Sequence, residues 1–417
     1  MAPVALKHFR AKWVRPTWQQ TAMHIASAAT AKSTAPTRVE WRPFATLAAI
    51  APQWRALAAR ALEPNVFYEP AFALPAASVW SHALGAGLVW SHTDRLIGLF
   101  PARIERRYGL PVLVGWTHPY GPLGTPLVDR DDAEAIVTAW LDYVAAGDEL
   151  PFLAILPLVP EQGLFATALA AALARRSLPS ALFGHHRRAL LAPGDDRVQY
   201  VEQSIGAKKR KELRRQRHRL ADLGTLKIDH TTNAPLIAEA LGDFLDVEAR
   251  GWKGRAGTAA ASHEDISRFI DSAVAELAAE GKARIDRLRI DGQTVAAAVT
   301  LRSGASAWTW KIAYDEAFAR SSPGVQLMIE LTEALLADGS ITAVDSCATA
   351  DHPMIDHLWR ERLALADHLI AVRAAPFAFP LACRLEALRR TAIGTAKTLR
   401  DRMRSRAGII PPFRGKD

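Results

Sequence analysis

The sequence predicts an α+β fold built from two related domains, each with a mixed, mainly antiparallel sheet flanked by helices. Two observations lead to this prediction. A succession of hairpin, strand, small-residue loop and helix occurs once in each half of the chain, with Trp116 and Trp310 at similar places in the two successions. The length of 417 residues also fits two ordinary domains.

The chain divides into four predicted parts. They are a disordered basic extension (1–38), a first domain (39–192), a second domain (193–375) and a basic amphipathic tail (376–417). The extension has no acidic residue before Glu40 and no apolar core of a signal peptide. A transit peptide is the alternative interpretation of this segment.

The elements of the first domain follow from apolar periodicity and turn residues. In order, we expect a helix at 44–62, a short helix after 65–72, a hairpin formed by 86–92 and 96–107, a strand at 110–117, a Gly/Pro loop at 118–127 and a helix at 131–144. This order places the loop between the last strand of the small sheet and the helix that covers it.

The second domain begins with helices and then repeats the strand pattern. We expect helices at 207–220, 234–250 and 262–281, a hairpin at 283–304, strands at 306–315 and 341–349, a helix from 323 to 338 and a basic helix at 381–408. Asp291-Gly292 is a strong turn signal for the hairpin. In the strand after it, strict alternation would place Trp308, Trp310, Ile312 and Tyr314 on one face.

The helix that begins after Ser322 has an entrance with two interpretations. Ser322 suits an N-cap and Pro323 suits the first helical position. Gly324 weakens the first turn, unless a ligand must approach the backbone closely. The entrance is therefore either a plain cap or a phosphate seat at a helix N-terminus.

Charge and cysteine content limit the classes of partner. The formal net charge is +9, which favours anionic ligands or an anionic membrane surface. Two cysteines, Cys347 and Cys383, argue against a disulfide framework and a cysteine-built metal site. We therefore expect no metal and a reducing, cytoplasmic compartment, with the alternative of the inner face of the membrane.

Three stretches of the second half resemble one family. They are ARGWKGRAGTA (249–259), WKIAYDEAFARSSPG (310–324) and VDSCATADHPMIDHLW (344–359). Together they resemble GNAT-type N-acyltransferases of the FemAB-like and CelD-like branch. The resemblance implies tandem GNAT-like domains, of which the first is degenerate, and acetyl-CoA or another acyl-CoA as co-substrate.

The resemblance also implies where the acyl-CoA binds. The pantetheine would lie where the strand at 306–315 diverges from its neighbour, and the phosphates would lie at the following turn. The implied cofactor-binding residues are Lys311, Arg320, Ser321, Ser322, Gly324 and Val325. The family signature has glycine three residues after the basic residue, whereas here Pro323 occupies that position and Gly324 follows.

Acyl transfer to an amine needs a general base, for which histidine or a carboxylate is suited. His352 is the first candidate, with a helix-capping role as the alternative. Asp345 lies inside a predicted strand, so it is either catalytic or a member of an ion pair. Asp315 follows the strand and could orient Lys311 or Arg320.

Aromatic and basic residues outside this strand are candidates for substrate binding. They are Trp252, Lys253 and Arg255 in GWKGR, Trp116 and Tyr120 around HPYGPLG, and Lys208 and Arg210 in AKKRK. The alternatives are a helix end with extended cations, a rigid turn and a solvated helix face, respectively.

The sequence thus predicts an N-acyltransferase acting on an amine of a sugar, lipid-linked or amino-acid-like acceptor, in envelope or exopolysaccharide synthesis. One alternative is a FemAB-like transferase that uses aminoacyl-tRNA, and another is a non-catalytic module of a polysaccharide synthase complex. We do not expect nucleic acid as a partner, because aromatic residues do not interleave with the basic runs. The basic tail would contact the membrane or pack on the second domain.

Overall fold

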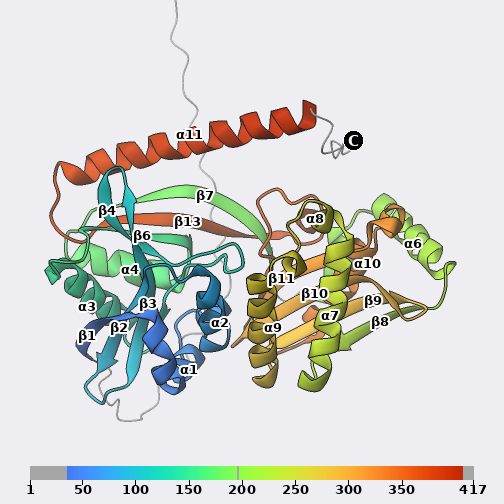
Figure 1. Cartoon of the computed structure of the whole chain (residues 1–417), viewed down its shortest axis with the longest axis horizontal. Coiled ribbons are helices and arrows are strands. Elements are labelled where there is room, and N and C mark those ends of the chain that lie inside the picture. Colours follow the sequence, from blue (N-terminus) through green and yellow to red (C-terminus); the bar gives the residue numbers. More distant parts are fainter. Residues whose placement is uncertain (1–34, 195–196, 407–417) are drawn as a thin grey trace, which may run out of the picture. The chain divides into compact units, whose positions relative to one another are not determined.

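A single sheet of 13 strands runs through the described residues, 35–194 and 197–406, of the computed structural model (Figure 1). The strand order is β1-β2-β3-β4-β6-β13-β7-β12-β11-β10-β9-β8, and β5 pairs with β3. The strands are β1 (Pro36–Pro43), β2 (Leu84–Ser91), β3 (Leu96–Arg107), β4 (Leu110–Gly115), β5 (Leu127–Val128), β6 (Leu153–Pro160), β7 (Ser180–Leu191), β8 (Leu226–Thr231), β9 (Ala283–Ile290), β10 (Gln293–Ser303), β11 (Ser306–Tyr314), β12 (Ala343–Asp345) and β13 (Glu361–Ala371).

Helices flank this sheet in both halves. They are α1 (Ala51–Ala59), α2 (Pro70–Trp80), α3 (Ala133–Ala146), α4 (Leu164–Arg175), α5 (Tyr200–Ser204), α6 (Ala207–Ala221), α7 (Ala234–Arg250), α8 (Trp252–Arg255), α9 (Glu264–Ala279), α10 (Pro323–Ala337) and α11 (Ala378–Arg406), with 3₁₀ turns η3 (Phe44–Ile50), η4 (Val66–Tyr68), η5 (Ala260–Ser262), η6 (Glu316–Ser321) and η7 (Ile355–His357). The predicted extension lies almost wholly outside the described residues. No helix in the described part of the chain combines the length and the apolarity needed to cross a bilayer.

The two halves repeat one architecture. In the first half β2, β3 and β4 are antiparallel, α3 follows, and β6 returns parallel to β4. In the second half β9, β10 and β11 are antiparallel, α10 follows, and β12 returns parallel to β11. The predicted α+β class with tandem domains is therefore confirmed.

One strand crosses between the halves. β13, near the end of the chain, lies between β6 and β7 and is antiparallel to both. β7 in turn pairs with β12, so the sheet is continuous. Asp367 and His368 interrupt the apolar pattern of β13. In the structure Asp367 accepts a hydrogen bond from the amide of Leu158 at 2.8 Å and pairs with Arg390 at 2.5 Å, which satisfies the charge within the strand.

The hairpin between β9 and β10 forms as its turn residues predict. Asp291 and Gly292 have φ values of 46° and 84°, which is the left-handed region that a two-residue hairpin turn requires at both positions. Aspartate tolerates this region better than most residues, and glycine adopts it freely. The turn therefore fixes the register of β9 against β10.

Aromatic packing joins the halves on one face of the sheet. Phe72 of α2 makes edge contacts with Phe269 of α9 and Trp310 of β11, with ring centroids 5.3 and 5.5 Å apart. The ring centroids of Phe67 and Trp308 lie 5.9 Å apart. These rings belong to one continuous core cluster, so the first half forms a wall beside β11.

A buried ion pair joins the halves where β7 meets β12. The guanidinium of Arg188 on β7 contacts the carboxylate of Asp345 on β12, and the two side chains are only 2% and 6% exposed. The same guanidinium donates to the carbonyl of Pro122 at 2.9 Å. The other oxygen of Asp345 accepts the amide of Cys347 at 2.9 Å. Of the two predicted roles of Asp345, the ion pair is the one the structure shows.

We expect Arg188→Ala to lower the free energy of unfolding by about 3–5 kcal/mol, because it leaves a buried carboxylate without its partner. Urea unfolding measures this loss. The matched control is Arg187→Ala, an exposed arginine on the same strand, which should change stability by less than about 0.5 kcal/mol. The double variant Arg188→Met/Asp345→Asn should recover most of the loss, and an equal loss in both single arginine variants would contradict the structural role.

Candidate functional site

The candidate site lies where β11 separates from β12. The two strands pair only from Ser306 to Trp308 on β11, although β11 continues to Tyr314. On its other side β11 pairs with β10 along its whole length. The segment 309–314 therefore has no strand partner on the β12 side within the described residues, and part of its backbone polar groups face that opening.

A β-bulge changes the faces of this segment. Thr300 pairs with Thr309 and Val299 with Lys311, so Trp310 is the extra residue on β11. Trp308, Trp310 and Lys311 consequently lie toward the core cluster shared with the first half. Ile312 and Tyr314 pack in the other cluster, with α10. The prediction that all four apolar side chains share one face is therefore wrong beyond Trp310, because the bulge shifts the alternation by one residue.

Lys311 is the titratable group at the centre of this segment. Its Nζ lies 3.7 Å from the ring centroid of Tyr120 and 5.8 Å from that of Trp310. Burial, together with the nearby charge of Lys253, lowers the pKa of Lys311 to about 8. In the described part of the chain we find no hydrogen bond or ion pair to its Nζ. Lys311 thus holds a proton that it can release near neutral pH.

Glu248 is a member of the site that the sequence analysis did not single out. Its carboxylate, at the end of α7, is 5% exposed. It pairs with Lys253 at 2.6 Å and accepts the amide of Ala260 at 2.9 Å. It also counteracts the lowering of the pKa of Lys311. Glu248 lies on the core-facing side of α7, seven residues after Leu241 and four after Phe244, so an acid within the apolar stripe is the sequence signal that could have identified it.

The predicted substrate residues of GWKGR have internal partners. Lys253 is held by Glu248, and the guanidinium of Arg255 pairs with Glu316 on η6. The side chain of Trp252 lies outside the described residues. The two cations therefore hold α8 against α7 and η6.

Aromatic rings form a wall beside Lys311. His118 stacks on Trp80 with ring centroids 4.3 Å apart, and Phe269 meets Trp80 and Tyr120 edge-on. Burial lowers the pKa of His118 to about 3, so its ring is neutral. Both ring nitrogens of His118 are buried without a hydrogen-bond partner among the described residues. The wall is thus largely apolar, with one neutral polar ring in it.

Trp116 and Tyr120, both predicted to bind substrate, lie in different environments. Trp116 is completely buried, and its indole nitrogen donates to the carbonyl of Trp80 at 3.2 Å. It therefore belongs to the core of the first half. Tyr120 is half-buried and faces the ammonium of Lys311. The indole of Trp310 donates to the carbonyl of Tyr120 at 2.7 Å, which holds the loop against β11.

Most backbone amides of the turn before α10 donate hydrogen bonds within the turn itself. Ser322 has a φ of 49°, and its amide donates to the carbonyl of Ala319 at 3.1 Å. The amides of Val325 and Gln326 both donate to the carbonyl of Ser322, at 3.0 and 3.1 Å. Pro323 has no amide hydrogen. The predicted phosphate cradle is therefore largely engaged internally, and Ser322 occupies the N-cap position without a side-chain capping bond.

Gly324 has an internal reason for its small size. A Cβ atom at this position would lie 3.2 Å from Cδ1 of Tyr314, which is a tight contact. Ser321 is buried and Arg320 is exposed. Of the predicted cofactor-binding residues on this turn, Arg320 is the one whose side chain reaches solvent as a cation.

The basic helix α6 lies beside this turn. It packs against η6 and α10, and Gln326 of α10 donates to the carbonyl of Leu213 at 2.8 Å. Lys208 is exposed, whereas Arg210 is half-buried and donates to the carbonyl of Glu202. The cations of α6 that point to solvent are Lys208, Lys209, Lys211, Arg214, Arg215 and Arg219. They place strong positive charge next to the entrance of α10.

His352 and Asp315 both stabilise turns. Nδ1 of His352 accepts long hydrogen bonds from the amides of Met354 and Ile355, at 3.4 and 3.5 Å. Burial lowers the pKa of His352, which keeps the ring neutral at pH 7. Asp315 accepts the amide of Ala317 at 2.9 Å and lies 3.9 Å from Arg250. The capping alternative for His352 is thus the contact that the structure displays.

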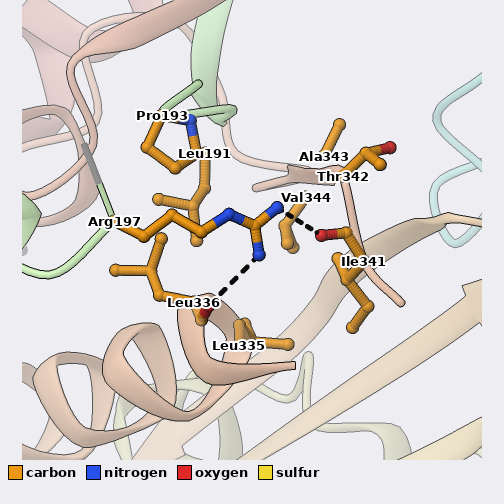
Figure 2. A pocket seen from close by; sticks show the side chains of 9 residues that line it. All are labelled: Leu191, Pro193, Arg197, Leu335, Leu336, Ile341, Thr342, Ala343 and Val344. Atoms are coloured by element: carbon orange, nitrogen blue, oxygen red, sulfur yellow. Dashed lines mark hydrogen bonds between the residues drawn. The ribbon is translucent and has the colours of Figure 1, made fainter. Parts of the chain in front are cut away.

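A small pocket elsewhere in the second half has a structural explanation. It is lined by Leu191, Pro193, Arg197, Leu335, Leu336, Ile341, Thr342, Ala343 and Val344 (Figure 2). The guanidinium of Arg197 enters it and donates to the carbonyls of Leu336 and Ile341 at 3.1 and 2.9 Å. Arg197 thereby caps the end of α10. In the described residues no group of three or more His, Cys, Asp and Glu side chains could hold a metal ion.

Comparison with known proteins identifies the fold around β11. Residues 207–352 match the family model of the GNAT acetyltransferase domain. Among curated proteins, none matches the sequence. The resemblance to GNAT-type proteins inferred from the three stretches is therefore confirmed.

Solved structures with the same fold cover most of the chain. The C-terminal domain of a putative lysylphosphatidylglycerol synthetase from Agrobacterium fabrum superposes with a TM-score of 0.51 at 13% identity, covering 82% of this chain and 97% of that one. FemX has a TM-score of 0.50 at 9% identity, with 78% and 96% covered. A conserved protein of unknown function from Bacteroides thetaiotaomicron has a TM-score of 0.50 at 11% identity, with 81% and 100% covered. At these identities the likeness concerns the fold.

The low pKa of Lys311 predicts a pH-dependent stability difference between the wild type and Lys311→Met. Because the folded-state pKa lies below the unfolded value, the unfolded state binds more protons between about pH 8 and 10.5, and the wild type gains stability as the pH rises through this window. We expect Lys311→Met to be more stable by roughly 2–3 kcal/mol at pH 7, with a smaller difference at pH 10.

Urea unfolding of both proteins at several pH values measures this difference, and Lys209→Met, an exposed lysine, is the control that should show no pH-dependent change. A constant difference across the window would mean that the pKa of Lys311 is not lowered.

Proposed function

We propose that this protein, whose residues 207–352 form a GNAT acetyltransferase domain, transfers an acyl group from an activated donor to an amine. The observation that carries the proposal is the position of Lys311. Its amine lies on the part of β11 that has left β12, and burial lowers its pKa to about 8. A lysine of this kind serves as a general base at a pH where ordinary lysines remain protonated.

In the proposed step, Lys311 both accepts and returns the transferred proton. The neutral amine of Lys311 accepts the proton of the attacking acceptor amine, while the C–N bond forms at the acyl carbon. Backbone amides of 309–314 that face the opening stabilise the oxyanion. The bond from the acyl carbon to the donor's sulfur or oxygen then breaks, and the lysine ammonium returns the proton to that atom. His352 is the second candidate base, because burial keeps its ring neutral.

The first proposed donor is acetyl-CoA or another acyl-CoA. The turn before α10 supplies few free amides, since those of Ser322 and Val325 donate to carbonyls of the turn. The phosphates would therefore meet side-chain cations, chiefly Arg320 and the exposed lysines of α6. Side-chain cations bind phosphate more weakly than a cluster of backbone amides does, and their binding is more sensitive to salt.

The second proposed donor is an aminoacyl-tRNA. The specific observation in its favour is the row of solvent-facing cations on α6 next to the turn that carries Arg320. Such a row suits a long phosphate backbone better than the three phosphate groups of CoA. The internal hydrogen bonds of the turn amides also favour this donor over acyl-CoA, because they leave few amides free for the phosphates of CoA.

The aromatic wall favours a ring-shaped acceptor. Trp80, Tyr120 and Trp310 come from both halves and lie around the amine of Lys311. Aromatic faces of this kind pack on the apolar face of a sugar or on an aliphatic chain. We propose an amino sugar, a lipid-linked amine or an amino-acid-like amine as acceptor, and envelope or exopolysaccharide synthesis as the setting. A non-catalytic module would show no transfer at all.

Lys311→Met should lower kcat by about 10²–10⁴-fold, the usual contribution of a general base. The measurement is thiol release from acetyl-CoA with a panel of amines, such as glucosamine and lysine, from pH 6 to 9.5. Because the acceptor's own ionisation affects both proteins, the ratio of wild-type to variant rates isolates Lys311. This ratio should rise with pH and level off above about pH 8.

The control for this series is His352→Asn, which can still accept the turn amides and should change kcat by less than about threefold. An unchanged kcat in Lys311→Met, with a large loss in His352→Asn, would transfer the base role to His352.

The donor is identified by ligand-dependent stability. At about 100 times its Kd, acetyl-CoA should raise the free energy of unfolding by about 2.7 kcal/mol. Gly324→Glu should abolish this gain by placing a negative charge where the phosphates would lie, whereas Gly339→Glu, just past the far end of α10, should retain it. Each gain is measured against the same variant without ligand, since a side chain at Gly324 also crowds Tyr314.

The parallel titration uses tRNA. No response to acetyl-CoA combined with tight, salt-sensitive tRNA binding that Lys211→Glu/Arg214→Glu removes would establish the second donor and exclude the first.

A further inference from the structure

The first half of the long helix α11 packs on the sheet (Figure 1). Phe379 and Ala382 are buried against β4, β6 and β13. Glu386 is 1% exposed; it accepts hydrogen bonds from the hydroxyl of Tyr108 and from Arg390. Arg390 also pairs with Asp367 of β13 at 2.5 Å. These contacts fix which side of α11 faces the protein.

A stripe of leucines runs along the opposite side. Leu381, Leu388 and Leu399 are 52%, 66% and 59% exposed. At 100° per residue their directions agree within about 20°, and they lie about 140–160° from the direction of Glu386. The stripe therefore points away from the sheet from Leu381 to Leu399.

The second half of α11 is exposed to solvent as far as its side chains are described. Every residue from Thr391 to Arg400 whose side chain is described is exposed, including Ile393 at 53% and Leu399. A helical segment of this length is only marginally stable in water, and Gly394 weakens it further. Exposed leucines on such a segment indicate a surface that receives them.

The charge of α11 identifies the chemistry of that surface. Residues 378–406 contain Arg384, Arg389, Arg390, Lys397, Arg400, Arg402, Arg404 and Arg406 but only the acids Glu386 and Asp401. Glu386 is already neutralised by its buried pairs with Arg389 and Arg390. Two copies of so cationic a helix would repel each other if they paired through the leucine stripe. An apolar stripe within a cationic helix instead fits an anionic interface.

We propose that α11 lies on an anionic membrane surface, with the stripe Leu381, Leu388 and Leu399 inserted at the level of the lipid headgroups and the net positive charge of the helix attracted to the phosphates. Interfacial helices combine these two features and lie in the plane of the membrane without spanning it. The inference goes beyond the proposed chemistry and does not depend on it. It assigns the protein a peripheral attachment through one face of one helix.

Flotation of the full chain with vesicles tests this attachment. We expect binding to vesicles of phosphatidylcholine with 30% phosphatidylglycerol, little binding to pure phosphatidylcholine, and at least tenfold weaker binding in 0.5 M than in 0.1 M NaCl. Leu388→Gln/Leu399→Gln should weaken binding to the anionic vesicles at least tenfold, because it removes two apolar side chains from the stripe.

The matched control is Leu223→Gln/Leu236→Gln, which replaces two exposed leucines elsewhere, at 58% and 51% exposure, and should leave binding unchanged. Both double variants should keep the wild-type free energy of unfolding, since all four side chains are exposed. Because the N-terminal extension is also basic, binding that survives in Leu388→Gln/Leu399→Gln overturns the proposal.

A dimer in sedimentation that this variant dissociates, without vesicle binding by the wild type, would assign the stripe to a second copy instead and equally overturn it. Thiol release measured without vesicles should be the same in both variants, so a failure of the membrane proposal is distinguishable from a failure of the proposed acyl transfer.

Discussion

The ion pair between Arg188 and Asp345 is the contact on which the arrangement of the site depends. It joins β7 to the last residue of β12, the point beyond which β11 stands without that neighbour. Arg188 also holds the carbonyl of Pro122, and through it the loop that carries Tyr120. Asp345 holds the amide of Cys347. A single buried pair therefore positions both sides of the opening, one from each half of the chain.

The environment of Lys311 follows from that positioning. Its amine faces an aromatic ring from the first half rather than a carboxylate, and the buried acid whose charge acts on it, Glu248, is already bound by Lys253. Low solvation and the absence of a dedicated counter-ion in the described part of the chain together favour the neutral amine. The chemical capacity of the site thus arises from how the halves meet, while the turn before α10 is mostly occupied by its own hydrogen bonds.

Local signals predicted the local elements of this fold. Asp291-Gly292 and the periodic helices, such as 234–250, formed where the sequence placed them. The bulge at Trp310 was not predictable, since one extra residue leaves no compositional trace. Glu248 stood out as an acid on the apolar stripe of its helix, but only the fold brings it near Lys311. β13 escaped prediction because its partners lie far away in the sequence and because its charges obscured its apolar pattern.

The insertion of β13 between β6 and β7 has a consequence for how the chain acquires its structure. During synthesis the first half emerges with one edge of β6 and both edges of β7 unpaired, and the strand that fills the gap between them is made about 170–220 residues later. The sheet therefore forms only after a contact between residues far apart in the sequence, which slows folding. The unpaired strand edges stay exposed, and prone to aggregation, for longer. No single cut of the chain between the halves would release two self-sufficient pieces, so any division of this protein for expression has to carry β13 along with the first half.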